Sequence, residues 1–542
     1  MARRILPTAN DAPAAHALLF APRARVNAIT TDAAELADRR RGIQVLILNT
    51  VAFGVCFACW MLNGVLVAYL VDSNLFAWDE GQVGLLIASP VLIGSIGRLP
   101  VGLLTDRFGG RLVYTGVLLA SAVPMYLLGR AESFAGFLLC SFGIGIAGTS
   151  FATGIAYTSI WFKKEQQGTA LGLFGMGNIG AAVTTFFAPQ LLRILTQHGG
   201  HPENWRLLPQ IYAGALVVMA ALFYLFTFPR SVPRAARLPL SRRLAPLGAL
   251  RVWRFGLYYF FVFGAFVALS QWLVLYYLNV YGMTLALAGI MAAAFSLPAA
   301  LTRALGGWLS DRYGARRVMY SVFGVAVVCC GLLIVPRMDI YSPGGGIVAT
   351  RAGVVTRVDH EEIVVGDKAY RFKARPGLTQ GVIRSQVADA ETLIWPTFKS
   401  WHEPSVRVGD SVAKRQVIAK GITHIYFQAN VWIFSALVLA LGVALGIGMA
   451  GVYKYIADYF PSEIGAVGGL VGVIGGLGGF VGPLVFGYIL KGSGIWTTCW
   501  MLLLFVALGC LVWLQFAVQR MMREKVPGLM AMMEAGDDDG RR

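Results

Sequence analysis

Two stretches of this sequence resemble each other: GRLPVGLLTDRFGGR at residues 97–111 and TRALGGWLSDRYGARR at residues 302–317. In each stretch an arginine within an apolar run, Arg98 or Arg303, precedes an aspartate by eight residues. A pattern that recurs once, far along a long chain, indicates two related halves. Each stretch then marks the same place in its half.

Long apolar segments surround both stretches. The chain of 542 residues is 57% hydrophobic and only 14% charged, a composition typical of membrane proteins. A bilayer core needs about 20 apolar residues of helix for each span. We expect twelve spans, near residues 42–71, 81–104, 112–129, 134–161, 168–195, 209–229, 254–280, 285–309, 318–336, 428–456, 465–490 and 495–519. The expected fold is therefore all-α and polytopic, with twelve transmembrane helices in two six-helix halves.

The basic residues predict the orientation of the chain. Lys and Arg outnumber Asp and Glu by 46 to 28, and they cluster in alternate connections between the apolar runs. By the positive-inside rule these connections are cytoplasmic, so both termini are expected in the cytoplasm and the chain in the cell's inner (plasma) membrane. This distribution favours contact with the lipid bilayer and not with nucleic acid. We expect cytoplasmic tails at 1–41 and 520–542, a linker at 230–253, and halves at 42–229 and 254–519.

One polar segment, residues 337–427, interrupts the second half. Its stretches at 347–366 and 404–421 alternate apolar and polar residues around turn signals, a pattern that predicts short strands. We expect a small β-rich extracytoplasmic domain, similar to the barrel-sandwich fold of biotinyl and lipoyl carrier domains. It lacks a Met-Lys-Met acceptor, so no covalent cofactor is expected, and its partner is unknown.

Arg98 and Arg303 lie about two helical turns inside their spans, where a charge is costly. A single such arginine could be structural, paired with a carboxylate or a helix end. Here there are two at matching positions, and no Asp, Glu or His lies in the middle of any expected span. The guanidinium group is a rigid fork of donors that suits a planar oxyanion. The pair therefore predicts a site for a small inorganic anion.

Glycine is dense in the fifth and eleventh expected helices. Most of these glycines are explained by close helix packing. Asn178, in the fifth helix, is different because an amide in the membrane needs polar partners and can donate to an oxygen ligand. We expect it to contact the substrate.

The loops at 105–111 and 310–316 are similar to the loop motif of the major facilitator superfamily. This resemblance implies a fold of two six-helix halves, and gating contacts at the cytoplasmic face for Asp106, Arg107, Asp311 and Arg312. The alternative is that these are solvated loop charges.

A more specific resemblance, to the nitrate/nitrite porter family, is carried by GTSFATGIAYTSIWFKKEQQGTALGLFGMGNIG at 148–180 and by the glycine-rich eleventh helix. It implies that Arg98, Arg303 and Asn178 bind the substrate. It also implies that aromatic residues sandwich the planar anion, at Phe151, Tyr259 and Phe263. It further implies that the backbone approaches the anion closely at Gly469 and Gly472. Some relatives have a serine near these glycines, and this chain departs from them there.

The expected function is secondary transport of nitrate and nitrite by alternating access, either as nitrate/nitrite antiport or as nitrate:proton symport. The stretch ALSQWLVLYYLNVYG at 268–282 resembles the symporter branch, whereas the lack of intramembrane acids favours exchange. The alternative is a transport-inactive membrane sensor or assembly protein that acts through the inserted domain. No catalytic constellation is present, and the seven cysteines lie in apolar segments, so neither an enzyme nor a metal or cofactor site is expected.

Overall fold

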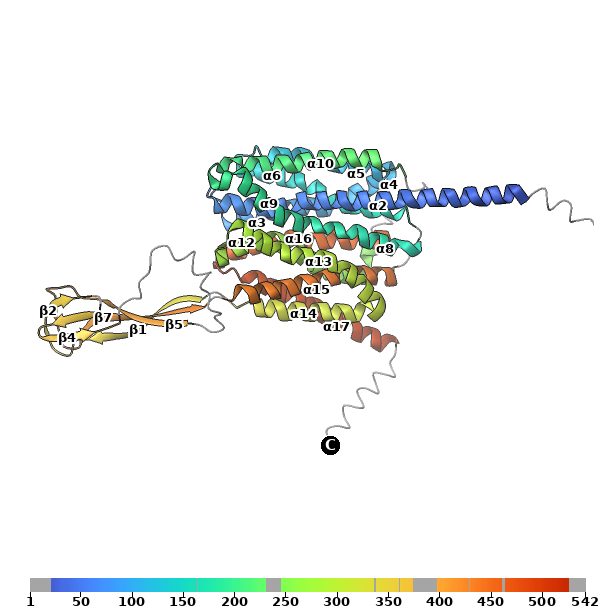
Figure 1. Ribbon diagram of the computed structural model, residues 1–542. Coiled ribbons are helices and arrows are strands. Elements are labelled where there is room, and N and C mark those ends of the chain that lie inside the picture. The colour runs from blue at the N-terminus through green and yellow to red at the C-terminus, as the bar shows by residue number, and fades with distance from the viewer. Residues whose placement is uncertain are drawn as a thin grey trace, which may run out of the picture.

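The computed structural model describes residues 21–162, 164–230, 245–335, 338–359, 361–373, 397–427, 429–460 and 464–525. Its helices form one bundle, from which a β-sheet domain projects at one end (Figure 1). In the described ranges eleven helices are long and apolar enough to cross a membrane, and a bent pair supplies a twelfth span. The expected polytopic fold with an inserted β-rich domain is confirmed. Large parts of the expected tails and linker lie outside the described residues.

The first half contains six spans. Its helices are α2 (Ala21–Asp72), α3 (Glu80–Ile96), α4 (Arg98–Phe108), α5 (Gly110–Leu128), α6 (Phe134–Ile144), α7 (Ser150–Ser159), α8 (Lys164–Gly175), α9 (Gly180–Leu195) and α10 (Leu207–Phe226). The helix of the first span begins at Ala21, well before the expected start at residue 42. The apolar residues of the span follow Arg41, so the part of α2 before them, which includes Asp38 and Arg39 to Arg41, extends the helix beyond the apolar run.

The second span is broken where an unbroken helix over 81–104 is expected. The axes of α3 and α4 differ in direction by 41°. Pro100 explains the break, because proline has no N–H to donate and its ring clashes with the carbonyl four residues earlier, that of Ile96. The expectation of a continuous helix is wrong at this point, and Arg98 is the first residue after the break.

The fourth and fifth spans also contain irregular turns. Short 3₁₀ segments, η1 (Gly145–Thr149) between α6 and α7 and η2 (Met176–Ile179) between α8 and α9, interrupt the α-helical winding. Such turns within a helix often mark functional positions. Asn178 lies in the second of them.

The second half contains six longer helices. They are α12 (Leu250–Tyr281), α13 (Leu285–Tyr313), α14 (Ala315–Leu333), α15 (Val431–Tyr459), α16 (Ile464–Ser493) and α17 (Thr498–Lys525). The two repeated stretches end alike, because Gly109 after α4 and Gly314 after α13 both have positive φ, 86° and 84°. The repeat in the sequence is therefore also a repeat of backbone conformation.

The inserted domain lies between α14 and α15 and consists of two antiparallel sheets. One sheet has the strand order β1-β7-β5, with β1 (Met338–Val348), β5 (Thr397–Pro404) and β7 (Val417–Phe427). The other has the order β4-β3-β2-β6, with β2 (Gly353–Val358), β3 (Glu362–Val365), β4 (Lys368–Arg371) and β6 (Ser411–Val412). A small apolar core around Val355 and Ile363 holds the domain together. The similarity to carrier domains stays a prediction.

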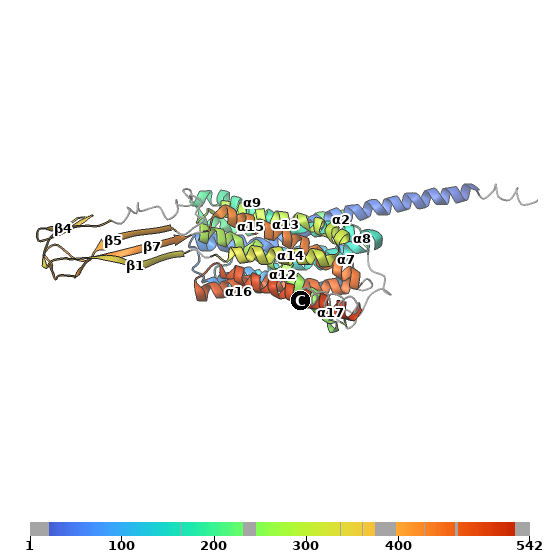
Figure 2. The same cartoon turned by 90° about the horizontal axis from the view of Figure 1, so that it is seen from below.

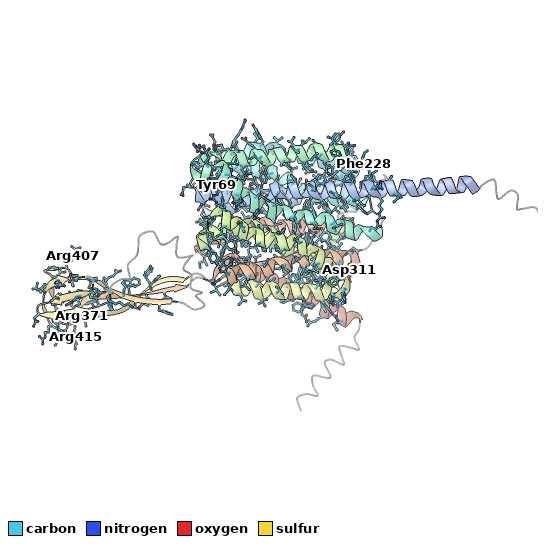
Figure 3. All side chains as sticks on the ribbon, in the orientation of Figure 1. Tyr69, Phe228, Asp311, Arg371, Arg407 and Arg415 are labelled. Atoms are coloured by element: carbon cyan, nitrogen blue, oxygen red, sulfur yellow. The ribbon has the colours of Figure 1, made fainter. Side chains whose placement is uncertain are left out.

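The bundle has two distinct ends, which we call the domain end and the loop end. The inserted domain extends from the domain end, as a view turned by 90° also shows (Figure 2). Tyr69 lies at the domain end, whereas Phe228 and Asp311 lie at the opposite, loop end, with both repeated Asp–Arg loops (Figure 3).

Candidate functional site

Arg98 lies inside the bundle at the start of α4. Its side chain is only 5% exposed. One guanidinium nitrogen, Nη1, donates a hydrogen bond of 2.5 Å to the carbonyl oxygen of Gly472, on α16 of the opposite half. Its Nε has no hydrogen-bond partner among the described residues. The break at Gly97 thus places a buried guanidinium group across the interface of the halves.

Arg303 occupies the matching position on α13 and is 8% exposed. Its Nη2 donates to the hydroxyl of Tyr259 at 3.5 Å, and its Nη1 has no partner in the described part of the chain. Within that part, Arg98 and Arg303 are the only charged side chains that are buried, and no buried carboxylate accompanies them. Two desolvated cations without a counter-ion attract an anion.

Aromatic rings bring the two arginines to one place. The guanidinium carbons of Arg98 and Arg303 lie 5.1 and 5.9 Å from the centroid of the same ring, that of Phe151. Arg98 also lies 5.5 Å from the ring of Phe263, which stacks in parallel on Tyr259 at 5.1 Å. The structure therefore gathers all three aromatic residues of the expected sandwich around the arginine pair.

Asn178 is fully buried, and neither its amide nitrogen nor its oxygen has a hydrogen-bond partner among the described residues. Gly175, three residues earlier, faces Arg303: a methyl group there would stand 3.3 Å from the guanidinium carbon. Because residues three apart share a face in such a tight turn, Asn178 follows Gly175 along the side that faces Arg303. Its unpaired amide can donate to an oxygen ligand at the pair.

The two glycines expected on the eleventh helix have different surroundings. A methyl group at Gly472 would lie 3.5 Å from Nη1 of Arg98 and 4.0 Å from Phe151, so the backbone borders the site there. Gly469, one turn nearer the loop end, is exposed, and no atom lies within 4 Å of its missing side chain. Of these two glycines, therefore, Gly472 borders the arginine pair, whereas Gly469 has no contact with it among the described residues.

The expected gating residues lie at the loop end. Asp311 forms an ion pair of 3.0 Å with Lys454 of α15, within its own half. Arg312 packs on aromatic rings of its own helix, and Arg107 packs on the adjacent Phe108. Asp106 occupies the place on α4 that Asp311 has on α13. Their gating role stays a prediction.

One member of the site, Tyr453 of α15, is absent from the sequence-based expectations. Its ring lies 5.8 Å from the guanidinium carbon of Arg303 and meets Tyr259 edge-on at 5.3 Å. Its hydroxyl donates to the Gly468 carbonyl at 3.4 Å. In the sequence Tyr453 stands beside Lys454, near a helix end, where tyrosine is typical of a membrane interface. Nothing local distinguishes it from such a residue.

At the domain end the two halves are pressed together. A methyl group at Gly84 of α3 would stand 2.6 Å from the carbonyl oxygen of Pro483 on α16. A methyl group at Gly289 of α13 would stand 2.3 Å from the carbonyl oxygen of Thr185 on α9. Glycine is needed at both crossings because a backbone atom of the opposite half occupies the space of a side chain.

An ion pair between the halves lies at the same end, where Lys491 donates to Asp79 at 2.9 Å. Together with the glycine crossings it closes the domain end. The open space at Gly469 lies on the other side of the arginine pair. The crossings and the ion pair therefore close the site toward the domain end, and the exposed Gly469 lies on its loop-end side.

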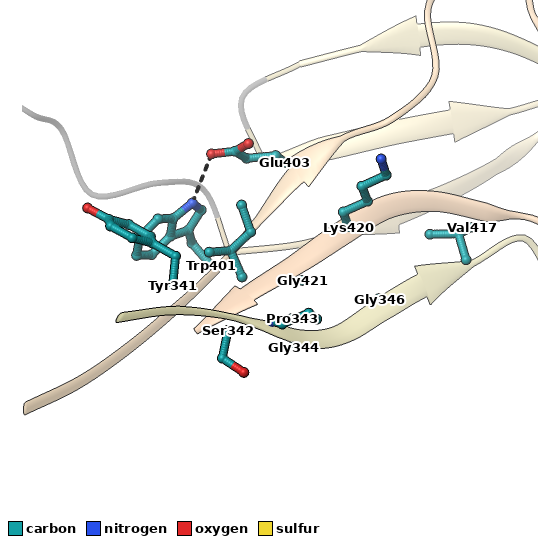
Figure 4. Close-up of a pocket in the computed structure, with 11 residues that line it drawn as sticks. Tyr341, Ser342, Pro343, Gly344, Gly346, Trp401, Glu403, Val417, Lys420 and Gly421 are labelled. Atoms are coloured by element: carbon teal, nitrogen blue, oxygen red, sulfur yellow. Dashed lines mark hydrogen bonds between the residues drawn. The ribbon is translucent and has the colours of Figure 1, made fainter. Parts of the chain in front are cut away.

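The inserted domain carries a groove of its own, of about 630 Å³, on the β1-β7-β5 sheet. There the indole N–H of Trp401 donates to Glu403, beside Tyr341 and Lys420 (Figure 4). This groove lies outside the helix bundle and contributes no residue to the arginine site.

Comparison with known proteins agrees with this geometry. The sequence profile of the Major Facilitator Superfamily matches residues 48–355 and 417–528, leaving out most of the inserted domain. Among solved structures, a bacterial homologue of the lysosomal transporter Spinster, inward-facing and occupied, has a TM-score of 0.56 at 15% identity over 88% of this chain and 96% of its own. The fucose:proton symporter of E. coli has a TM-score of 0.52 at 13% identity, over 88% and 99%. These likenesses show the fold.

Proteins of similar sequence indicate the family more specifically than the solved structures do. The chain is 36% identical over 513 residues to the probable nitrate/nitrite antiporter NarK1 of Thermus thermophilus, covering 94% of this chain and 99% of that one. It is 35% identical over 302 residues to the probable nitrate/nitrite transporter NarK2 of Mycobacterium tuberculosis, covering 55% and 74%. The chain is a multi-pass membrane transporter and not an enzyme; it belongs to the Major Facilitator Superfamily and, within it, to the nitrate/nitrite porter family.

Proposed function

We propose that this protein carries nitrate and nitrite across the cell's inner membrane by alternating access. The observation that carries the proposal is the pair of buried guanidinium groups, Arg98 and Arg303, which share the Phe151 ring and have no buried counter-ion among the described residues. The names of the similar nitrate/nitrite proteins agree with this chemistry.

The anion binds between the two arginines. The unpartnered Nε of Arg98 and Nη1 of Arg303 supply donors from opposite halves. The face of Phe151 supports a planar ion, and the amide of Asn178 adds a neutral donor. The guanidinium donors suit a small planar oxyanion, whereas a cationic substrate would find no buried carboxylate among the described residues.

Exchange of nitrate for nitrite is the transport mode that this site supports best. Without an anion, two guanidinium groups in a low dielectric repel each other, and this repulsion opposes passage of the empty protein through its occluded state. Bound anion removes the repulsion, so the halves reorient when loaded. In the described part of the chain no Asp, Glu or His is buried to accept a coupling proton, which further favours antiport over symport.

The orientation follows from the charged loops. We place the loop end in the cytoplasm, because the Arg-rich connections lie there, and the domain end outside. With this orientation, the close contacts at Gly84, Gly289 and Asp79 seal the side that faces outward. The tight glycine crossings at the domain end separate when the site opens outward.

Nitrate uptake into proteoliposomes tests this proposal. The native protein is compared with Arg98→Lys and Arg303→Lys, with nitrite inside or with a pH gradient imposed. Lysine keeps the charge but loses the fork, so we expect kcat/KM to fall by about 100-fold in either variant. Arg193→Lys, an exposed arginine on α9, is the control and should retain native uptake.

Uptake that requires internal nitrite and is lost in both site variants supports the exchanger. Uptake driven by the pH gradient alone would replace exchange by proton symport. A folded native protein that moves no nitrate under either condition would overturn the substrate assignment, and the sensor or assembly role of the inserted domain would then stand in its place.

A further inference from the structure

A third crossing of the two halves, between α2 and α12, carries a polar side chain that the arginine site does not use. A methyl group at Gly64 of α2 would stand only 2.7 Å from the Cα atom of Gln271 on α12. This crossing therefore belongs to the closed domain end, with those at Gly84 and Gly289. Gln271 follows Phe263 by eight residues, about 12 Å along the helix away from the arginines.

The amide of Gln271 is buried and makes no hydrogen bond within the described part of the chain. The residue is fully shielded, and neither Nε2 nor Oε1 has a partner among the described residues. The hydroxyl of the adjacent Ser270 is in the same situation. A buried amide without partners destabilises the state that buries it, and an apolar residue would seal the same crossing better.

Asn63, the neighbour of Gly64, shows what a structural amide looks like at this depth. It is equally buried, but its nitrogen donates to the Leu86 carbonyl at 2.9 Å and to the Ser141 hydroxyl at 2.8 Å, both in its own half. Its bonds therefore persist when the halves move apart. Gln271 has no such partners in the state shown here, so any polar partner it has belongs to another state.

Opening the domain end must uncover Gln271, because Gly64 touches its backbone only while the halves are closed. The same opening connects the arginine pair to the outside. An anion that enters or leaves on that side passes along α12, beside an amide whose Nε2 is free to donate to an oxyanion.

We propose that Gln271 is a further substrate-positioning residue, which hydrogen-bonds nitrate or nitrite on the domain-end side when the transporter is open outward. Arg98 and Arg303 then hold the anion in both states, whereas Gln271 acts in only one. This inference rests on the proposed function, since it assumes that the native protein moves nitrate.

The test compares the apparent KM for nitrate on the two sides of the membrane. Right-side-out vesicles give the value for the domain end, and inverted vesicles give the value for the loop end. For Gln271→Leu we expect the domain-end KM to rise about tenfold, the effect of one hydrogen bond to a charged ligand, with the loop-end KM within about twofold of native. Gln271→Asn keeps the amide and should recover most of the loss.

The matched control is Asn279→Leu on the same helix, whose amide already donates to the Leu275 carbonyl at 2.8 Å. It should change neither KM. If Gln271→Leu has the same KM as the native protein on each side of the membrane, the inference is overturned. A fall in maximal rate with both KM values unchanged would also overturn it, because that result indicates a purely structural role. A native protein that transports no nitrate would instead overturn the proposed function, whatever Gln271 does.

Discussion

Gly84 and Gly289 are 205 residues apart, as are Arg98 and Arg303, so each pair marks matching positions in the two halves. The glycines have the same surroundings: each faces a backbone carbonyl of the opposite half, at Pro483 and at Thr185. The arginines do not. Arg98 follows a helix break and bonds a carbonyl of the opposite half, whereas Arg303 lies within the unbroken α13 and bonds Tyr259 of its own half.

The difference separates two tasks. Closing the domain end requires the helices to touch at both crossings at once. A methyl group at either matching glycine would therefore overlap a carbonyl oxygen of the opposite half, at 2.6 Å for Gly84 and 2.3 Å for Gly289. Binding one small ion between the two halves does not require Arg98 and Arg303 to have the same surroundings. The break coincides with two differences in the repeat, Gly97 and Pro100 in the first half against Thr302 and Leu305 in the second, and proline is the residue that interrupts a helix.

Among changes outside the arginine pair, the largest effect is expected at the two glycine crossings of the domain end. Gly84→Ala and Gly289→Ala each place a methyl group against a carbonyl oxygen that cannot rotate away. Such overpacking costs about 1–3 kcal/mol in the closed state, enough to shift the balance of states by 5- to 150-fold. Because the neighbouring atom is backbone at both crossings, we expect a cost in the upper part of this range and a fall of at least tenfold in the initial rate of nitrate/nitrite exchange in both variants.

The chain offers matched controls for this pair. Gly102 on α4 and Gly307 on α13 are also 205 residues apart, and no atom lies within 4 Å of their missing side chains. Gly102→Ala and Gly307→Ala should therefore exchange at the native rate. If only one of Gly84→Ala and Gly289→Ala slows exchange, the two crossings do not contribute equally to closure, and the proposed equivalence of the two glycines is wrong.

A smaller effect is expected from making the first half resemble the second. Pro100→Leu removes the cause of the bend, so the second span straightens and the Arg98 guanidinium moves away from the Gly472 carbonyl. We expect the KM for nitrate to rise about tenfold, through loss of one positioned charge-assisted donor. Leu305→Ile at the matching position is the control. An unchanged KM for Pro100→Leu would show that the break does not position Arg98.

The smallest effect is expected at the ion pair between the halves. The backbone N–H of Gln82 and then Lys491 hold the pKa of Asp79 below its ordinary value of 3.8. The Gln82 bond caps α3 within its own half and persists when the halves separate, so only the part of the lowering due to Lys491 stabilises the closed end. That contribution is present above the ordinary pKa and is lost as pH falls through the lowered pKa. The pair therefore adds no pH dependence to exchange between about pH 6 and 8.

Asp79→Asn tests the size of this contribution. Both side chains of the pair are partly exposed, so solvent screens the interaction and its loss should slow exchange by less than about twofold. Exchange rates measured from pH 6 to 8 should run parallel in the native protein and the variant. A steep loss of rate in the variant would give the ion pair a role in closure comparable with that of the glycines.

Much of the site was accessible to sequence reasoning, for a local reason. A charge in the hydrocarbon stands out against apolar neighbours, so Arg98 and Arg303 could be identified from their own surroundings, and an amide among glycines in a membrane helix marked Asn178 in the same way. The twelve spans and the inserted strands followed from periodicity and length. The break at Gly97 did not, because Pro100 near a helix end is compatible with both a bent and a straight span.

The sequence by itself determined the class of fold, the repeat of the halves and the two buried cations, because hydropathy, periodicity and the cost of desolvating a charge act over a few neighbouring residues. Only the tertiary structure decided that both arginines meet one phenylalanine ring, that Tyr453 completes the site, and that Gln271 is buried with no hydrogen-bond partner among the described residues. These facts depend on contacts between residues hundreds of positions apart, and the packing of the two halves alone sets them.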